Sequence, residues 1–383
     1  MMQRIVLLAI ACLLLIGLSL FGSGPAGNPV VTFLDPFLDA AIRLALNKWS
    51  EPIYASELAG LTSLSADYSQ IEDLSWLQYC TNLTYLDLHY NQISDISPLT
   101  NLTNLTFLDL KVNQISDISP LANLTDLTGL GLSGHQISDI ALVVDLTRLT
   151  SLSLPSSQIS DISRLASLTD LTYLNLGDNQ ISDISPLANL TNLTYLDLDS
   201  NHISDISSLA NFTDLIYLYL DSNQISDIFS LANLTNLTYL GLHSNQISDI
   251  SPLTNLTNLT YLGLGSNQIS EVSPLADLTN LTSLAHLDLT HNQISDISAL
   301  ASLTNLIYLQ IGWNQLSDIS ALANLANLTD IDLRHNQISD IGPLVQNDGL
   351  GTGDVISLEG NPLSSDSIGI YRSQLGARGV AVS

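Results

Sequence analysis

The sequence carries a column of carboxylates at one fixed position of a repeated segment. Each acid stands four residues after a recurring marker position, and most are 22 residues apart: Asp73, Asp95, Asp117, Asp139, Asp161, Asp183, Asp205, Asp227, Asp249, Glu271, Asp296, Asp318 and Asp340. Such a column could bind cations, or each carboxylate could cap the following turn by accepting backbone N–H bonds. Because calcium takes about six to eight oxygen ligands and each copy supplies one carboxylate, we expect the capping role.

The marker position itself is Asn in most copies. These residues are Asn91, Asn113, Asn179, Asn201, Asn223, Asn245, Asn267, Asn292, Asn314, Asn336 and Asn361, and the other copies carry Ser69, His135 and Ser157. An amide side chain both donates and accepts hydrogen bonds, so we expect it to point inward and satisfy backbone groups at the exit of each strand. Stacked copies would then form a ladder of amides.

Residues 179–200 indicate which elements hold these polar columns in place. Leu196 and Leu198 are two residues apart, which is the spacing of a strand with one buried side. From Ile184 to Leu193 the apolar residues are three apart, a spacing that fits 3₁₀ turns better than an α-helix. One strand and one narrow return arm cannot bury their apolar sides alone, so each copy must stack on its neighbours around a shared core.

Residues that are constant between copies are explained by the repeated fold. We therefore look for ligand-binding residues at the positions that vary between copies. On the exposed side of the strand they lie six, four, two and one residues before each marker. The first of these columns is aromatic with a gap: Tyr85, Phe107, Gly129, Ser151, Tyr173, Tyr195, Tyr217, Tyr239, Tyr261, His286 and Tyr308. Cross-strand packing would explain such a column, but tyrosine is also a preferred interface residue.

Two groups of residues in these columns make up the predicted ligand-binding site. The first group is aromatic and acidic, and the second places a Trp between two His residues on successive copies. An exposed Trp in that position has little structural reason to be there, although a solvated loop edge is the alternative interpretation. The predicted site consists of Tyr173, Tyr195, Asp197, Asp199, Tyr217, Tyr219, Asp221, Tyr239, Tyr261, His291, Trp313 and His335.

Composition narrows the classes of partner and of chemistry. Nine Lys and Arg residues against 37 Asp and Glu residues give a net charge of −28, which disfavours nucleic acid and anionic membranes and favours basic partners. The two cysteines, Cys12 and Cys80, exclude a disulfide-stapled scaffold, and Cys80 replaces a repeat leucine and should be buried. Since no catalytic constellation, phosphate loop or HExxH motif occurs, we expect no enzyme, no cofactor and no metal site.

The chain divides into four parts. Residues 1–27 begin with a basic residue, continue as an apolar run and end in small residues, which is typical of a secretory signal peptide. An uncleaved N-terminal anchor is the alternative. Residues 28–60 contain Asp35 and Pro36 before an apolar stripe at helical spacing, which predicts a helical N-terminal cap. Residues 61–341 form the repeat array.

The final part, residues 342–383, is predicted to be a C-terminal cap. The repeat pattern loosens there and makes one last strand at residues 355–358. Ile368, Tyr371 and Leu375 then line one side of a short helix that ends near Gly379. Counting the marker positions from Ser69 to Asn361 gives fourteen coils, the last of which lies in this cap.

The segment LTYLDLDSNHI at residues 193–203 is identified as a leucine-rich repeat, and the 22-residue form with SDISPLANL resembles that of bacterial internalins. Residues 33–46, FLDPFLDAAIRLAL, also resemble the helical cap before internalin repeats. The resemblance, over residues 33–341, implies an α/β solenoid: a right-handed horseshoe with a short parallel concave sheet and a 3₁₀-like convex side. No immunoglobulin-like domain or LPxTG-type wall anchor follows, so host-cell invasion is not carried over.

The resemblance and the exposed columns lead to one functional hypothesis and two alternatives. We expect a non-catalytic recognition module, secreted or on the cell surface, that binds a basic protein or peptide ligand on the concave face as a monomer. The alternatives are a glycan ligand such as a cell-wall polysaccharide, and a passive envelope component with no dedicated ligand. Nucleic acid is not an expected partner, nor is a membrane apart from the N-terminal anchor.

Overall fold

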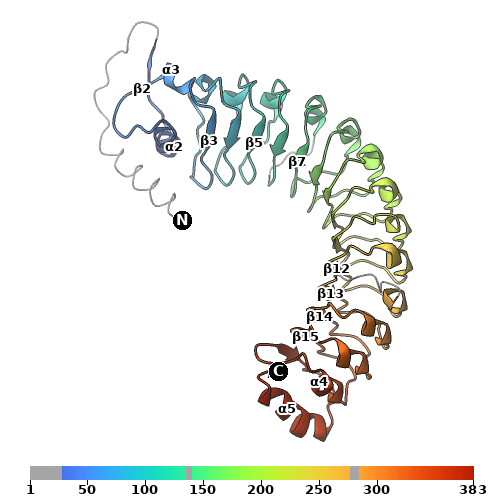
Figure 1. Cartoon of the computed structure of the whole chain (residues 1–383). Helices are drawn as coiled ribbons and strands as arrows, with labels where there is room; N and C mark the ends of the chain where they lie inside the picture. Colours follow the sequence, from blue (N-terminus) through green and yellow to red (C-terminus); the bar gives the residue numbers. More distant parts are fainter. Residues whose placement is uncertain (1–27, 135–139, 277–283) are drawn as a thin grey trace. The chain divides into compact units, whose positions relative to one another are not determined.

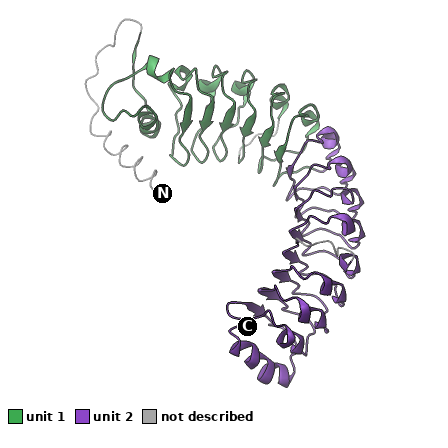
Figure 2. Ribbon diagram, viewed as in Figure 1, with its two compact units in different colours: residues 1–181 green, residues 182–383 purple. Residues whose placement is uncertain are grey.

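The computed structural model describes residues 28–134, 140–276 and 284–383, so the expected signal peptide and His135 lie outside the described residues. The chain forms two compact units, residues 1–181 and 182–383 (Figure 2). In each unit, short parallel strands lie on one side of a stack of coils and 3₁₀ helices lie on the other (Figure 1). We call the exposed side of the strands the strand face.

Unit 1 begins with the expected helical cap. Helix α2 (Pro36–Leu46) starts after Asp35, whose carboxylate accepts N–H bonds from Phe37 and Leu38 at 2.8 and 3.0 Å. The second oxygen of Asp35 accepts the Glu72 N–H at 2.7 Å, which ties the helix to the first coil. A two-stranded antiparallel sheet was not expected: β1 (Val30–Val31), before α2, pairs with β2 (Ile53–Tyr54), which leads into α3 (Ala55–Leu58).

The coils of unit 1 follow the predicted order of strand and 3₁₀ turn. The strands are β3 (Ser63–Ser65), β4 (Tyr85–Asp87), β5 (Phe107–Asp109), β6 (Gly129–Gly131), β7 (Ser151–Ser153) and β8 (Tyr173–Asn175). The 3₁₀ helices are η1 (Leu77–Tyr79), η2 (Ser97–Leu99), η3 (Ser119–Leu121), η4 (Ala141–Asp145) and η5 (Ser163–Ser167). From β3 to β8, each pair of neighbouring strands is parallel and in register, because the copies have equal length.

Unit 2 repeats the same coil. Its strands are β9 (Tyr195–Asp197), β10 (Tyr217–Tyr219), β11 (Tyr239–Gly241), β12 (Tyr261–Gly263), β13 (His286–Asp288), β14 (Tyr308–Gln310), β15 (Asp330–Asp332), β16 (Val355–Ser357) and β17 (Ala381–Val382). Its 3₁₀ helices are η6 (Ser185–Asn189), η7 (Ser207–Asn211), η8 (Phe229–Leu231), η9 (Ser251–Asn255), η10 (Ser273–Ala276), η11 (Ser298–Ser302) and η12 (Ser320–Asn324). The three-residue apolar spacing therefore predicted the return arm correctly.

The C-terminal end differs from the prediction in two respects. Strand β16 is not the last, because β17 pairs with it in parallel. Helix α4 (Gly342–Gln346) precedes β16, and the final helical segment consists of a π-helical turn (Ser367–Tyr371) that continues into α5 (Arg372–Ala377). Leu375 is fully buried as expected, but Ile368 is 56% exposed, so the predicted apolar side is wrong there. The π-turn changes the angular step between residues, and Ser367 takes the buried position instead.

The core is a continuous column of leucine and isoleucine side chains in each unit. Leu196 and Leu198 have no exposed surface, and neither do Leu187, Leu190 and Leu193 on the return arm. Cys80 is buried as predicted, and burial raises the pKa of its thiol to about 12, so it acts as a small apolar side chain. Among the described residues, no helix has the length and apolar character needed to cross a membrane.

Candidate ligand-binding face

The repeated Asn side chains are structural, as predicted. The Asn223 amide donates to the carbonyls of Leu198 and Leu220 at 3.0 and 3.2 Å, and its oxygen accepts the Ile203 N–H at 3.0 Å. The same three bonds recur at Asn113 in unit 1. Each amide thus satisfies buried backbone groups of two successive coils, so the ladder of Asn side chains is part of the repeated fold.

The repeated Asp residues cap the 3₁₀ turns, again as predicted. The Asp205 carboxylate accepts the Ser207 N–H at 2.8 Å, and Asp249 and Asp296 bind Ser251 and Ser298 in the same way. The backbone N–H bond, followed by the serine hydroxyl, lowers the pKa of each of these carboxyl groups. The Asp residues of the column that the structure describes are therefore accounted for by turn formation, and Asp139 lies outside the described residues.

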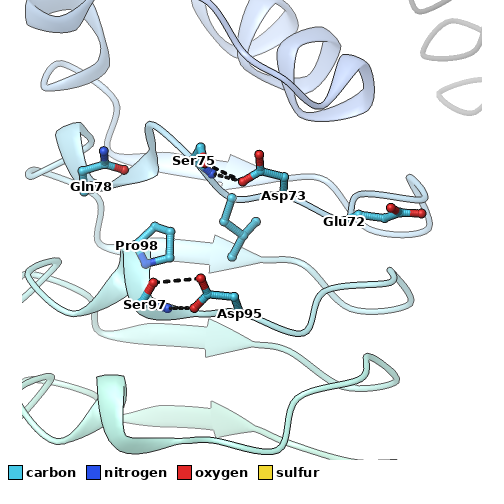
Figure 3. A pocket seen from close by; sticks show the side chains of 8 residues that line it. Glu72, Asp73, Ser75, Gln78, Asp95, Ser97 and Pro98 are labelled. Atoms are coloured by element: carbon cyan, nitrogen blue, oxygen red, sulfur yellow. Dashed lines mark hydrogen bonds between the residues drawn. The ribbon is translucent and has the colours of Figure 1, made fainter.

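A cavity of about 490 Å³ opens at the first coils of unit 1, where several polar side chains meet. It is lined by Glu72, Asp73, Leu74, Ser75, Gln78, Asp95, Ser97 and Pro98 (Figure 3). Asp73 binds the backbone N–H and hydroxyl of Ser75, and Asp95 binds those of Ser97. These two carboxylates are turn caps, so the cavity is a consequence of the repeat and we assign it no ligand.

The parallel register gathers the predicted tyrosines into one row on the strand face of unit 2. Tyr195 is paired in register with Tyr217, Tyr217 with Tyr239, and Tyr239 with Tyr261. Tyr217 is 43% exposed, whereas the other three are partly buried. Tyr173 lies in unit 1, on β8 in register with Ser151, and the remaining predicted site residues all lie in unit 2.

Ring stacking between coils occupies most faces of these aromatic rings. Tyr239 stacks on Tyr261 with centroids 4.3 Å apart and an interplanar angle of 3°, and Tyr219 covers the Tyr239 ring at 4.5 Å. Tyr195 meets Tyr219 at 5.3 Å. Cross-strand packing is therefore part of the reason for the column.

The predicted acids lie beside the tyrosine row and crowd together. Asp197 accepts the Asp199 N–H at 3.1 Å, Asp199 accepts the Asp221 N–H at 2.6 Å, and Asp221 accepts the His243 N–H at 2.6 Å. Burial, together with the charges of Asp221 and Asp197, raises the pKa of Asp199 to about 7. Burial also raises the pKa of Asp221. The strand face of unit 2 thus holds closely spaced carboxylates that repel each other when ionised.

His243 belongs to this site although the sequence did not single it out. Its Nδ1 accepts the Gly265 N–H at 3.1 Å, so Nε2 carries the proton in the neutral ring and donates to the Tyr261 hydroxyl at 3.2 Å. The imidazole lies over Gly263, where an added Cβ would be 2.2 Å from Nε2. The signal in the sequence was a pair of residues without side chains, Gly263 and Gly265, one coil after a histidine in a column of the strand face.

The second predicted group forms a separate stack. Trp313 lies between His291, with ring centroids 5.1 Å apart, and His335, at 3.7 Å. All three are exposed and have positive φ angles of 54°, 59° and 53°, which belong to the turn after each strand. Since both faces of the indole are covered, its exposed part is the ring edge. The structure places this group in a different column from the tyrosines and acids.

A matching family model identifies the class of protein to which the chain belongs. The model described as leucine-rich repeats (2 copies) matches residues 60–101, 103–144, 147–189, 169–211, 191–233, 213–255, 235–277, 257–302, 282–324 and 304–346. The chain therefore belongs to the leucine-rich repeat family. Comparison with curated protein sequences gives no match.

Solved structures narrow the likeness to internalins. An internalin (InlF) from Listeria monocytogenes is 42% identical, with 83% of this chain and 94% of that chain covered and a TM-score of 0.78. The functional domain of InlJ from the same organism is 25% identical over 83% of this chain and 79% of that chain, with a TM-score of 0.62. A leucine-rich repeat protein of Leptospira interrogans, 22% identical over 86% and 97%, has a TM-score of 0.73 and shares the fold. The chain is an internalin-like leucine-rich repeat protein.

Proposed function

We propose that the chain is an exported, non-catalytic recognition module that binds a basic protein or peptide on the strand face of unit 2, as a monomer. The observation that carries this proposal is the crowded acidic cluster of Asp197, Asp199 and Asp221 beside the tyrosine row. A cationic side chain of a ligand would favour the ionised form of Asp199, whose pKa is raised to about 7 by burial and by its acidic neighbours. Binding and ionisation would then support each other.

The tyrosine row supplies the second part of the proposed contact. Tyr217 is exposed, and Tyr195 and Tyr219 present ring edges and hydroxyls next to the acids. Tyrosine contributes large contact areas with few rotatable bonds, and hydroxyl groups can bind the backbone of a peptide. His291, Trp313 and His335 form a second contact region in the proposal, through the exposed edges of their stacked rings.

The ring stacking favours a peptide over a glycan as the ligand. Sugar rings bind aromatic residues by lying against a ring face, and Tyr239 and Trp313 have both faces covered by neighbouring rings. A peptide can use edges, hydroxyls and carboxylates instead. Among proteins of this fold, a plant peptide hormone receptor has been solved in complex with RGF2, and its 21% identity to this chain concerns the fold alone.

Export is the part of the proposal that rests on residues 1–27, which have the composition of a secretory signal peptide. These residues lie outside the described part of the chain. N-terminal sequencing of material recovered outside the cell tests export directly. A start near Asn28 supports cleavage, an intact Met1 supports the anchored alternative, and full retention inside the cell contradicts export.

A capture experiment tests the binding site. The full chain and an Asp197→Asn, Asp199→Asn double variant are immobilised and exposed to surface proteins and, separately, to purified polysaccharide. Both substitutions keep an oxygen that can accept the N–H bonds of Asp199 and Asp221, so the frame is preserved. We expect a basic protein to be retained by the parent and lost by the variant. Equal retention contradicts the site, retention of polysaccharide alone supports the glycan alternative, and no retention supports the passive envelope component.

A further inference from the structure

A second polar cluster lies on the strand face of unit 1 and contains three groups that bind metal ions. Asp87 on β4 and Asp109 on β5 are paired in register, and His89 follows Asp87 on the same side of the chain. One ligand atom from each of these three side chains lies within 4.8 Å of the others. The sequence held the signal, because Asp87 and Asp109 are 22 residues apart and Asp-x-His places both side chains on one face.

The three side chains of this cluster are largely buried, unlike acids on an open surface. Asp109 is only 8% exposed, and the side chains of His89 and Asp87 are 24% and 14% exposed, so solvent reaches the cluster from one side. His89 Nδ1 lies 2.5 Å from Asp87 Oδ1. One imidazole nitrogen and two carboxylates are a recognised donor set for first-row divalent metals, with water in the remaining positions.

The cluster already binds one cation, which is the ammonium group of Lys111. Lys111 Nζ lies 3.1 Å from Asp109 Oδ2, and its side chain is 36% exposed. The next coil contributes Gly131, where an added Cβ would lie 2.8 Å from Asp109 Oδ1 and 3.2 Å from Lys111 Cε. A residue with a side chain at that position would fill the space beside the carboxylate. The glycine keeps this space open, and the exposed lysine can leave it.

We propose that Asp87, His89 and Asp109 bind a divalent transition-metal ion, of which Zn²⁺ is the representative, in place of the Lys111 ammonium group. His89 supplies the ring nitrogen that now faces Asp87, and each carboxylate supplies an oxygen. The ion offsets the repulsion of two acids on neighbouring strands more fully than one lysine does. This site lies in unit 1, so its test is independent of the proposed ligand-binding face in unit 2.

Titration calorimetry with ZnCl₂ tests the site on the full chain, purified without a polyhistidine tag. We expect one saturable Zn²⁺ site in the parent, a loss of affinity of more than about tenfold in His89→Ala, and no change in His202→Ala, the control at an exposed histidine. Lys111→Met removes the competing cation and keeps an aliphatic stem, so it should tighten binding by about tenfold. Co²⁺ absorption gives a second readout that reports nitrogen ligation.

Two results overturn the proposal. The first is equal Zn²⁺ affinity in the parent and in His89→Ala, since binding would then occur elsewhere on this acidic chain. The second is the absence of saturable binding up to about 1 mM Zn²⁺ in both the parent and Lys111→Met. A melting curve of His89→Ala that matches the parent in the absence of metal ensures that lost binding is not lost folding.

Discussion

The strand faces of both units carry acids four residues before the marker, at Asp87 and Asp109 in unit 1 and at Asp197 in unit 2. The position two residues later differs, because it holds His89 and Lys111 in unit 1 and Asp199 and Asp221 in unit 2. In unit 1, Asp109 is paired with Lys111 and Asp87 with His89. In unit 2, Asp199 has Asp197 and Asp221 as neighbours, and burial and these charges raise its pKa to about 7. The coil and the hydrogen bonds of its repeated Asn side chain are the same in both units. The comparison teaches that side chains at a few variable positions decide whether an acid of the strand face has a basic neighbour or only other acids beside it.

The first prediction tests whether the hydrogen bonds of the repeated Asn side chains stabilise the two units equally. Asn113→Ala in unit 1 and Asn223→Ala in unit 2 each remove three hydrogen bonds from buried backbone groups. We expect each to lower the free energy of unfolding by about 3 kcal/mol in urea titrations. The exposed Asn104→Ala and Asn236→Ala serve as controls with much smaller losses. Clearly unequal losses at the two buried sites would mean that the units do not share one frame.

The second prediction concerns the space that His243 occupies in unit 2. Gly263→Ala places a Cβ 2.2 Å from His243 Nε2, so the imidazole must move and lose its bonds to Tyr261 and the Gly265 N–H. We expect a loss of about 1–3 kcal/mol in unfolding free energy. His243→Ala combined with Gly263→Ala should recover part of that loss. An unchanged stability in Gly263→Ala would show that His243 is not held in this position.

The third prediction concerns the pH dependence of stability that follows from the raised pKa of Asp199. The folded pKa of Asp199, about 7, lies above its ordinary value of 3.8, so Asp199 costs the folded state stability as the pH rises from 3.8 to about 7. Asp199→Asn removes this cost, and its melting temperature should exceed that of the parent by a margin that grows over this range and then stays constant. A pH-independent margin would contradict the raised pKa.

A change at Asp87 in unit 1 should have the opposite sign and the smallest effect. Asp87→Asn weakens the hydrogen bond between Asp87 Oδ1 and His89 Nδ1, which lie 2.5 Å apart, so we expect a loss of about 0.5 kcal/mol in urea titrations at neutral pH. A gain in stability would place Asp87 among the repelling acids. In that case the contrast between the units would disappear.

Sequence reasoning could predict the coil because the coil is determined by local spacing. The two-residue step at Leu196 and Leu198 and the three-residue step before them are direct consequences of strand and 3₁₀ geometry. The antiparallel pair of β1 and β2 and the π-turn at Ser367 could not be predicted, since each occurs once in the chain, at an end of the stack. The coil occurs many times in the sequence, whereas each end of the stack occurs only once.

The sequence predicted which residues of the candidate site lie in one row, but not which side chains contact each other. The 22-residue period places Tyr195 beside Tyr217 without further information. The period does not show that the His243 side chain turns over Gly263, because this contact joins two different columns. Side-chain direction within the exposed rows depends on the size of the residue in the next coil, and that is a property of the folded stack.

The central claim is that a basic protein or peptide binds the strand face of unit 2, and one measurement tests it most directly. The affinity of the captured partner is measured for the parent, for the Tyr195→Ala, Tyr217→Ala double variant, and for Tyr85→Ala as a control in the same column of unit 1. We predict a loss of at least about tenfold in the double variant and unchanged affinity in the control. Full affinity in the double variant would contradict the assignment of the site.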